Sequence, residues 1–394
     1  MDTIILKIYG PNKFRADRRY LFMPELTARR YEDLSLTEKT SDRQYLRHFV
    51  LHAPKSEDYL PGAEIFETLS KDKRSLVYIL QVDFSAPKLL YGNSVQEVVE
   101  ADKELLFSRL KSALARVGVM LEIEQIAEAR VSAVHFCKNI LLPPVMKIRG
   151  ILKELGRVDI DKVVDVTSKM HKNGGRVLSL YSGTLEHVFY EKVSDSMRPK
   201  NKRQDKGPVD RERAIIERFG LKDREVFRYE YRIKKTQTVM RDVSRALGRS
   251  YGDICFNDLF APGLFKEVLL GNWRKLIARP ENRLALFAPI DDLDLLSHTL
   301  AEAKKFGSIA HSANKGLSSY GLTCAIRNHG AKEVRGILLE AWCREHPDRI
   351  TEKIKTAAEL IKTIPYSNTI AFIDKALEVF VRLDMETLQN ESHG

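Results

Sequence analysis

The sequence predicts an α+β protein, with a mainly antiparallel sheet in the first part of the chain and helices in the second. In segment 225–235, polar and apolar side chains alternate with the period of two that is typical of a strand. Segment 185–192 follows the same pattern, and a Gly-containing turn precedes it. From about residue 236 onward, apolar residues recur at helical spacing. We therefore expect a mixed domain over residues 1–250 and a helical domain over residues 251–394.

Further strands are predicted at 4–9, 76–84 and 127–136, where β-branched and aromatic residues gather. Ser94 and Glu97 fit the S-x-x-E capping pattern and predict the start of a long helix that ends at Gly118. A shorter helix is expected over 145–155. Segments 176–181 and 187–193 predict a hairpin that turns around Ser182-Gly183-Thr184.

The helical part contains periodic segments at 263–277, 291–306, 317–329, 331–343, 351–363 and 368–383. Gly330 separates two of them, which is the pattern of a helix-turn-helix unit but also of an ordinary packed helix pair. Polar residues that could contact DNA surround this turn: Arg327, Asn328, His329, Lys332 and Arg335.

The net charge of the 394-residue chain is +11, and its isoelectric point is about 9.3. This excess of positive charge favours a polyanionic partner, most simply nucleic acid, although an anionic membrane surface offers similar charge. No apolar run predicts a membrane-spanning helix, and the first residues lack the features of a signal peptide. The four cysteines form no CxxC pair, so we expect a reducing cytoplasm rather than disulfides or structural zinc.

A tyrosine and a lysine stand two positions apart at Tyr190 and Lys192, and we expect both on one face of the predicted strand. On the second strand, Arg228, Glu230 and Arg232 share one face, and Lys234 continues it. This combination suits phosphodiester chemistry. Tyrosine can act as the nucleophile, lysine can stabilise its phenolate, and arginines can bind phosphates. Packing of an ordinary strand tyrosine is the alternative, and Tyr181, Tyr229 and Tyr231 are rival nucleophiles.

Asp83, His135 and Glu230 lie on three separate predicted strands and could converge on a metal ion. Oxygen ligands with one imidazole favour Mg²⁺ or Mn²⁺ over a zinc site. In the alternative interpretation, Glu230 only pairs with its arginine neighbours, Asp83 caps a turn and His135 is a core histidine.

A basic linker follows the first strand, between Ser194 and Asp210, and is interrupted by proline and glycine. It is either a solvated loop or a loop that contacts DNA phosphates. The residues that we predict as phosphate contacts there are Arg198, Lys200, Lys202 and Arg203, with Lys206 nearby.

With these residues in view, the chain resembles the gene II/X family of replication initiation proteins from filamentous phages and related rolling-circle plasmids. The resemblance covers about residues 75–245, and the last third of the chain fits only loosely. It rests on the order and spacing of the segments 82–93, 134–140, 188–192 and 227–234, which read VDFSAPKLLYGN, VHFCKNI, VFYEK and FRYEYRIK. His135 stands where some relatives carry aspartate. The two-histidine motif of other rolling-circle initiators is absent.

The resemblance implies a rolling-circle initiator with a relaxase-like catalytic sheet in the bacterial cytoplasm. Such an enzyme nicks one strand at a phage or plasmid origin, stays joined to the 5′ phosphate through tyrosine, and later closes the displaced strand. It implies Tyr190 as the nucleophile, Lys192 as its support, Glu230 as the acidic residue, and Mg²⁺ or Mn²⁺ as cofactor. Origin DNA, a host helicase and a polymerase would be the partners. The alternative function is a sequence-specific DNA-binding protein that regulates replication or transcription without cutting; RNA binding is less favoured because no RNP-type aromatic motif is present.

Overall fold

The computed structural model describes residues 1–10, 14–16, 21–22, 47–51, 58–70, 75–158, 167–172, 176–197, 209–341 and 347–383. These residues form a mixed α+β structure built on a large antiparallel sheet, as the sequence predicts. In the described part of the chain, no helix is both long enough and apolar enough to cross a membrane.

The main sheet runs in the order β3-β4-β5-β6-β1-β8-β12-β11-β10-β9, with antiparallel pairing throughout. A second, two-stranded sheet pairs β2 with β7. The strands are β1 (Thr3–Tyr9), β2 (Arg15–Ala16), β3 (Leu21–Phe22), β4 (Arg47–Leu51), β5 (Gly62–Leu69), β6 (Leu76–Ser85), β7 (Val119–Met120), β8 (Arg130–Leu141), β9 (Thr167–Lys172), β10 (Val177–Ser182), β11 (Leu185–Glu191) and β12 (Val226–Ile233).

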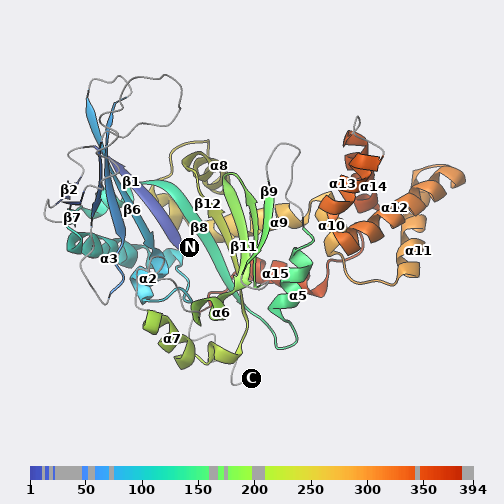
Figure 1. Ribbon diagram of the computed structural model, residues 1–394, viewed down its shortest axis with the longest axis horizontal. Helices are drawn as coiled ribbons and strands as arrows, with labels where there is room; N and C mark the ends of the chain where they lie inside the picture. The colour runs from blue at the N-terminus through green and yellow to red at the C-terminus, as the bar shows by residue number, and fades with distance from the viewer. Residues whose placement is uncertain are drawn as a thin grey trace.

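Helices cover one face and the ends of this sheet, and a further group of helices extends beyond it (Figure 1). The α-helices are α2 (Ala86–Tyr91), α3 (Lys103–Arg116), α4 (Ile123–Ala127), α5 (Ile148–Leu155), α6 (Lys192–Met197), α7 (Val209–Arg218), α8 (Thr236–Ala246), α9 (Leu264–Ile277), α10 (Pro280–Leu286), α11 (Asp292–Ala303), α12 (Ile309–His329), α13 (Ala331–Ala341), α14 (Pro347–Leu360) and α15 (Asn368–Val379). The 3-10 turns are η2 (Glu100–Asp102), η3 (Leu221–Asp223), η4 (Phe256–Phe260) and η5 (Lys304–Phe306).

Strand β12 shows how sequence alternation divides the sheet into two chemically different faces. Its odd-numbered side chains, such as Tyr229, enter the hydrophobic core, where α9 places the fully buried Trp273 beside them. Its even-numbered side chains, such as Glu230, point to the opposite face. The strand is buried on both faces, so burial alone does not distinguish them. One face carries the core and the other carries a cluster of charged groups.

The domain boundary predicted near residue 250 does not coincide with a break in packing. Helix α9, beyond that boundary, contacts β8 and β12, and one hydrophobic cluster joins Met1 to Leu377. Helices α10 to α14 gather at one side of the molecule, away from α2 and α3 (Figure 1). The C-terminal helices therefore complete the core of the sheet as well as forming their own group.

Two local predictions are wrong. Lys192 does not continue the strand of Tyr190, because β11 ends at Glu191 and Lys192 is the first residue of α6. Ser94 and Glu97 do not cap the long helix, because α3 starts at Lys103 after the turn η2. Both side chains of the S-x-x-E pattern bind groups far away in the sequence instead.

Candidate functional site

The candidate site lies on the polar face of the three neighbouring strands β8, β12 and β11. Strand pairing places Tyr190 of β11 directly opposite Arg228 of β12. On the other side of β12, Arg232 faces His135 of β8. Directly opposite residues of an antiparallel pair share a face, so the hairpin and the register of β12 bring these side chains together.

Glu230 is the centre of this cluster and is only 2% exposed. Its Oε1 accepts hydrogen bonds from the Tyr190 hydroxyl and from Arg228 Nε, each at 2.6 Å. Its Oε2 accepts from Arg232, with Nε at 2.7 Å and Nη2 at 2.6 Å. Burial works to raise the pKa of Glu230, but the charges of Arg228 and Arg232 outweigh it and hold the pKa well below its usual value. Glu230 is therefore ionised at neutral pH.

Arg228 is 1% exposed and uses each of its nitrogens. Nε binds Glu230, Nη2 binds Asp2 at 2.6 Å, and Nη1 donates to the Ser94 carbonyl at 2.9 Å and to Asn139 Oδ1 at 3.3 Å. Burial raises the pKa of Asp2, but the charge of Arg228 opposes this and the net effect is a lowered pKa. The guanidinium therefore lies between two carboxylates and joins β12 to the start of β1.

Tyr190 is 7% exposed, and its hydroxyl points at a carboxylate that can accept a proton. Burial raises the pKa of Tyr190 well above 10; the charge of Arg228 opposes this shift, whereas the charges of Glu230 and Asp2 add to it. At neutral pH the phenol therefore keeps its proton and donates a hydrogen bond to Glu230.

Lys192, the predicted support of the phenolate, instead forms a buried chain with two other residues. Its Nζ donates to Ser94 Oγ at 2.7 Å, and Ser94 Oγ donates to Glu212 of α7. Burial and the nearby charge of Arg228 lower the pKa of Lys192, and Glu212 opposes that shift. Lys192 thus lies near Arg228 and Asp2, without a direct hydrogen bond to Tyr190 among the described contacts.

The three predicted metal ligands do not converge. Asp83 lies on β6, which β1 and β8 separate from the strand of Glu230, so the two strands are three spacings, or roughly 14 Å, apart. Asp83 is also exposed, whereas Glu230 is buried. His135 does lie near Glu230, and burial together with the charge of Arg232 lowers its pKa to about 4.

The carboxylates that do come together are those of Asp2 and Glu230, and Arg228 binds both. Within the described ranges, no group of three or more His, Cys, Asp or Glu side chains is arranged to hold a metal ion. In this arrangement the two carboxylates bind the Arg228 guanidinium, which neutralises their charge.

The rival tyrosines occupy different environments. Tyr229 and Tyr231 lie on the core face, where their hydroxyls bind His187 Nδ1 at 3.0 Å and Asp242 at 2.6 Å. Tyr181 lies on the polar face opposite Glu186, and Lys234 Nζ sits 4.6 Å from its ring centroid. Tyr181 is therefore the rival that shares a face with Tyr190.

The predicted phosphate contacts divide into two groups. Arg228, Arg232 and Lys234 all engage carboxylates: the first two bind Glu230, and Lys234 binds Glu186 at 2.7 Å. The predicted linker contacts lie outside the described residues: Arg198, Lys200, Lys202, Arg203 and Lys206.

The turn at Gly330 joins α12 to α13, as predicted. Its arginines are used within the helical group, because Arg327 pairs with Asp292 and Arg335 pairs with Glu281 at 3.5 Å. This arrangement favours a packed helix pair over a DNA-reading helix.

Sequence reasoning missed several members of the network. Asp2, Ser94, Asn139 and Glu212 belong to four distant segments, and the sequence patterns around them do not indicate that they meet. Only the uncommon burial of their polar groups shows their role, and burial depends on the tertiary fold. Comparison with protein families, with curated proteins and with solved structures finds no match for this chain.

Proposed function

We propose that this chain is a tyrosine-dependent DNA nicking and closing enzyme that initiates rolling-circle replication of a phage or plasmid. One observation carries the proposal: the hydroxyl of Tyr190 is 2.6 Å from Glu230, inside a cluster that also holds Arg228. A nucleophile hydrogen-bonded to an oriented acceptor, next to a cation, is the arrangement that covalent catalysis requires. The resemblance in sequence around residues 188–192 and 227–234 supports the same assignment.

In the proposed step, the phenol oxygen of Tyr190 attacks a backbone phosphorus while its proton passes to Glu230. The bond from phosphorus to the 3′ oxygen breaks, and the leaving oxygen takes a proton from water. The product is a 5′-phosphotyrosine and a free 3′ hydroxyl. Arg228 and Arg232 supply positive charge where the phosphate oxygens gain negative charge. Closing reverses the step, because a 3′ hydroxyl attacks the phosphotyrosine and Glu230 returns the proton.

From the resemblance we also propose origin DNA as the partner, with single-stranded character at the nick, and a requirement for Mg²⁺ or Mn²⁺. A host helicase and a polymerase would follow the nick, in a bacterial cytoplasm. No step above passes through a metal ion. The metal requirement is therefore tested as a separate arm of the experiment.

The test is incubation with supercoiled DNA of the replicon that encodes the chain, with Mg²⁺, with Mn²⁺, and with a chelator. The expected product is a nicked circle joined to protein. Tyr190→Phe should abolish both nick and adduct and keep DNA binding, because only the attacking oxygen is removed. Tyr181→Phe is the matched control, since it removes a hydroxyl from the same face, and it should nick normally. An adduct formed by the Tyr190 variant would transfer the role to another tyrosine.

A second candidate function is DNA binding without cutting. The observation that favours it is the low exposure of Tyr190, 7%, together with the full set of hydrogen bonds around Arg228. Such a saturated network also fits a purely structural core. This function predicts that the wild-type chain, with all its tyrosines, binds the replicon DNA specifically and forms no covalent adduct with it.

A further inference from the structure

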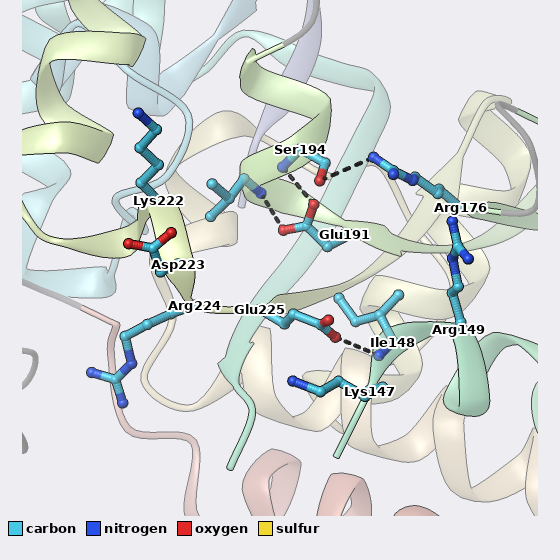
Figure 2. Close-up of a pocket in the computed structure, with 11 residues that line it drawn as sticks. Lys147, Ile148, Arg149, Arg176, Glu191, Ser194, Lys222, Asp223, Arg224 and Glu225 are labelled. Carbon is cyan, nitrogen blue, oxygen red and sulfur yellow. Dashed lines mark hydrogen bonds between the residues drawn. The ribbon is translucent and has the colours of Figure 1, made fainter. Parts of the chain in front are cut away.

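A pocket of about 440 Å³ opens where α5 begins, where β11 passes into α6, and where the turn η3 leads into β12. Figure 2 shows the side chains at these places, together with Arg176, which directly precedes β10. The pocket is lined by Lys147, Ile148, Arg149, Arg176, Glu191, Val193, Ser194, Lys222, Asp223, Arg224 and Glu225. Five of these residues are cationic and three are acidic.

Two of the acidic side chains are already occupied by backbone amides. Glu225 accepts a hydrogen bond from the Ile148 amide at 2.6 Å, at the start of α5. Glu191 accepts from the amides of Val193 and Ser194 at the start of α6, in contacts that Figure 2 marks. These carboxylates therefore serve the helix ends, and the helix amides they bind are not open to a ligand.

Four of the cations, Lys147, Arg149, Arg176 and Lys222, have no carboxylate partner among the described contacts. Lys147, Arg149 and Lys222 are exposed, and in the described part of the chain no carboxylate lies within ion-pair distance of them. Among the contacts between described residues, Arg176 reaches the Ser194 hydroxyl, at 3.5 Å. In Figure 2 the side chains of Arg149 and Arg176 lie beside each other on one wall, with Lys147 below them. An anion bound there would relieve the repulsion between these charges.

We propose that this pocket binds a backbone phosphate of a nucleic acid strand. Arginine donors are suited to this because a guanidinium forms paired hydrogen bonds with phosphate oxygens. The volume of the pocket, about 440 Å³, exceeds that of a phosphate alone and leaves room for the attached sugars. The pocket also contains Glu191, the residue that follows Tyr190, so a bound strand would pass the same end of β11. The inference rests on the proposed function for the identity of the polyanion, which the net charge of +11 favours.

The test compares the double variant Arg149→Gln/Arg176→Gln with the charge-matched control Arg109→Gln/Lys353→Gln, whose residues are exposed on α3 and α14. Binding of a labelled single-stranded oligonucleotide is measured over a range of salt concentrations, without divalent cations. One lost phosphate contact should reduce the slope of log affinity against log salt by roughly 0.7. We expect this reduction and a several-fold weaker binding in the pocket variant only. Circular dichroism and melting curves establish that both variants fold.

A second arm titrates inorganic phosphate against the oligonucleotide complex at constant ionic strength. Phosphate should weaken the complex of the wild type and of the control more than that of the pocket variant. A pocket variant that matches the control in affinity and slope overturns the inference. The melting temperature is also measured with and without inorganic phosphate. If phosphate raises the melting temperature of the wild type but not of the pocket variant, while the variant binds the oligonucleotide as the wild type does, the nucleic-acid assignment is overturned and the pocket binds a free phosphate. Failure of the wild-type chain to bind any DNA overturns the proposed function as well, whereas loss of nicking alone in Tyr190→Phe leaves this inference standing.

Discussion

Replacement of Glu230 by glutamine is the most direct perturbation of the candidate site. Glutamine has nearly the same shape but no charge, and one carboxylate oxygen becomes an NH₂ donor. In the native protein both carboxylate oxygens accept hydrogen bonds: Oε1 from Tyr190 and Arg228, and Oε2 from Arg232. Whichever way the amide turns, its NH₂ group meets other donors.

The size of the effect follows from what each partner keeps. Removing one member of a buried ion pair costs about 3–5 kcal/mol, because the other charge is left uncompensated. Arg228 retains its ion pair with Asp2, and Arg232 is 29% exposed and can be solvated by water. The charge of each arginine is therefore still partly compensated, and the cost in free energy is smaller than for a fully isolated charge. We therefore expect Glu230→Gln to lower the free energy of unfolding by about 2–4 kcal/mol. The same change removes the proposed proton acceptor and should reduce nicking strongly.

The assay is denaturant unfolding at pH 7, with nicking measured on the same preparation. Glu104→Gln is the matched control, because Glu104 is 79% exposed in a 3.5 Å pair with Lys103, and such a pair contributes about 0–1 kcal/mol. A stability loss in Glu230→Gln no larger than that of the control would refute the proposed role of Glu230 as the centre of a buried charge network. Normal nicking would refute its role as proton acceptor.

Two further predictions concern acid stability and helix packing. Burial lowers the pKa of His135 to about 4 and that of His187 to about 3, so between these values and pH 6.5 the unfolded chain binds protons that the native chain does not. The free energy of unfolding should therefore fall by roughly 1 kcal/mol or more per pH unit on acidification from pH 6.5 to 5. His135→Asn should make that pH dependence shallower. In α12, a Cβ at Gly316 would lie 2.8 Å from Leu300 Cδ2 and 3.2 Å from its Cα, whereas a Cβ at Gly321 would meet nothing within 4 Å. Gly316→Ala should therefore lower the melting temperature through overpacking, and Gly321→Ala should raise it through the higher helix propensity of alanine, worth up to about 1 kcal/mol; equal shifts in the two variants would contradict this packing.

The alternating pattern of β12 made the local part of the site predictable. A period of two assigns Glu230 and its arginine neighbours to one face and Tyr229 to the other, whatever the rest of the fold. The hairpin of β10 and β11 was also readable, because its turn residues lie next to each other in the sequence. Those two facts, with one strand pairing, are enough to place Tyr190 beside Arg228.

The rest of the site could not be read in this way, because it depends on long-range contacts. Asp2 is 226 positions from Arg228, and Ser94 is 118 positions from Glu212, yet each pair is hydrogen-bonded. Periodicity carries no information about such pairs. The end of β11 was predicted one to two residues too late, because Glu191 accepts hydrogen bonds from the first amides of α6 and the helix starts at Lys192.

The same network that stabilises the sheet explains how the proposed nucleophile stays inactive at rest. The pKa of Glu230 is held low and the pKa of Tyr190 is held high, so the proton remains on the phenol. A scissile phosphate would change this balance in two ways. It would compete with Glu230 for Arg228 and Arg232, which raises the proton affinity of the carboxylate, and bonding of the phenol oxygen to phosphorus would make its proton more acidic. Under the proposed mechanism, proton transfer therefore becomes favourable only when DNA occupies the site.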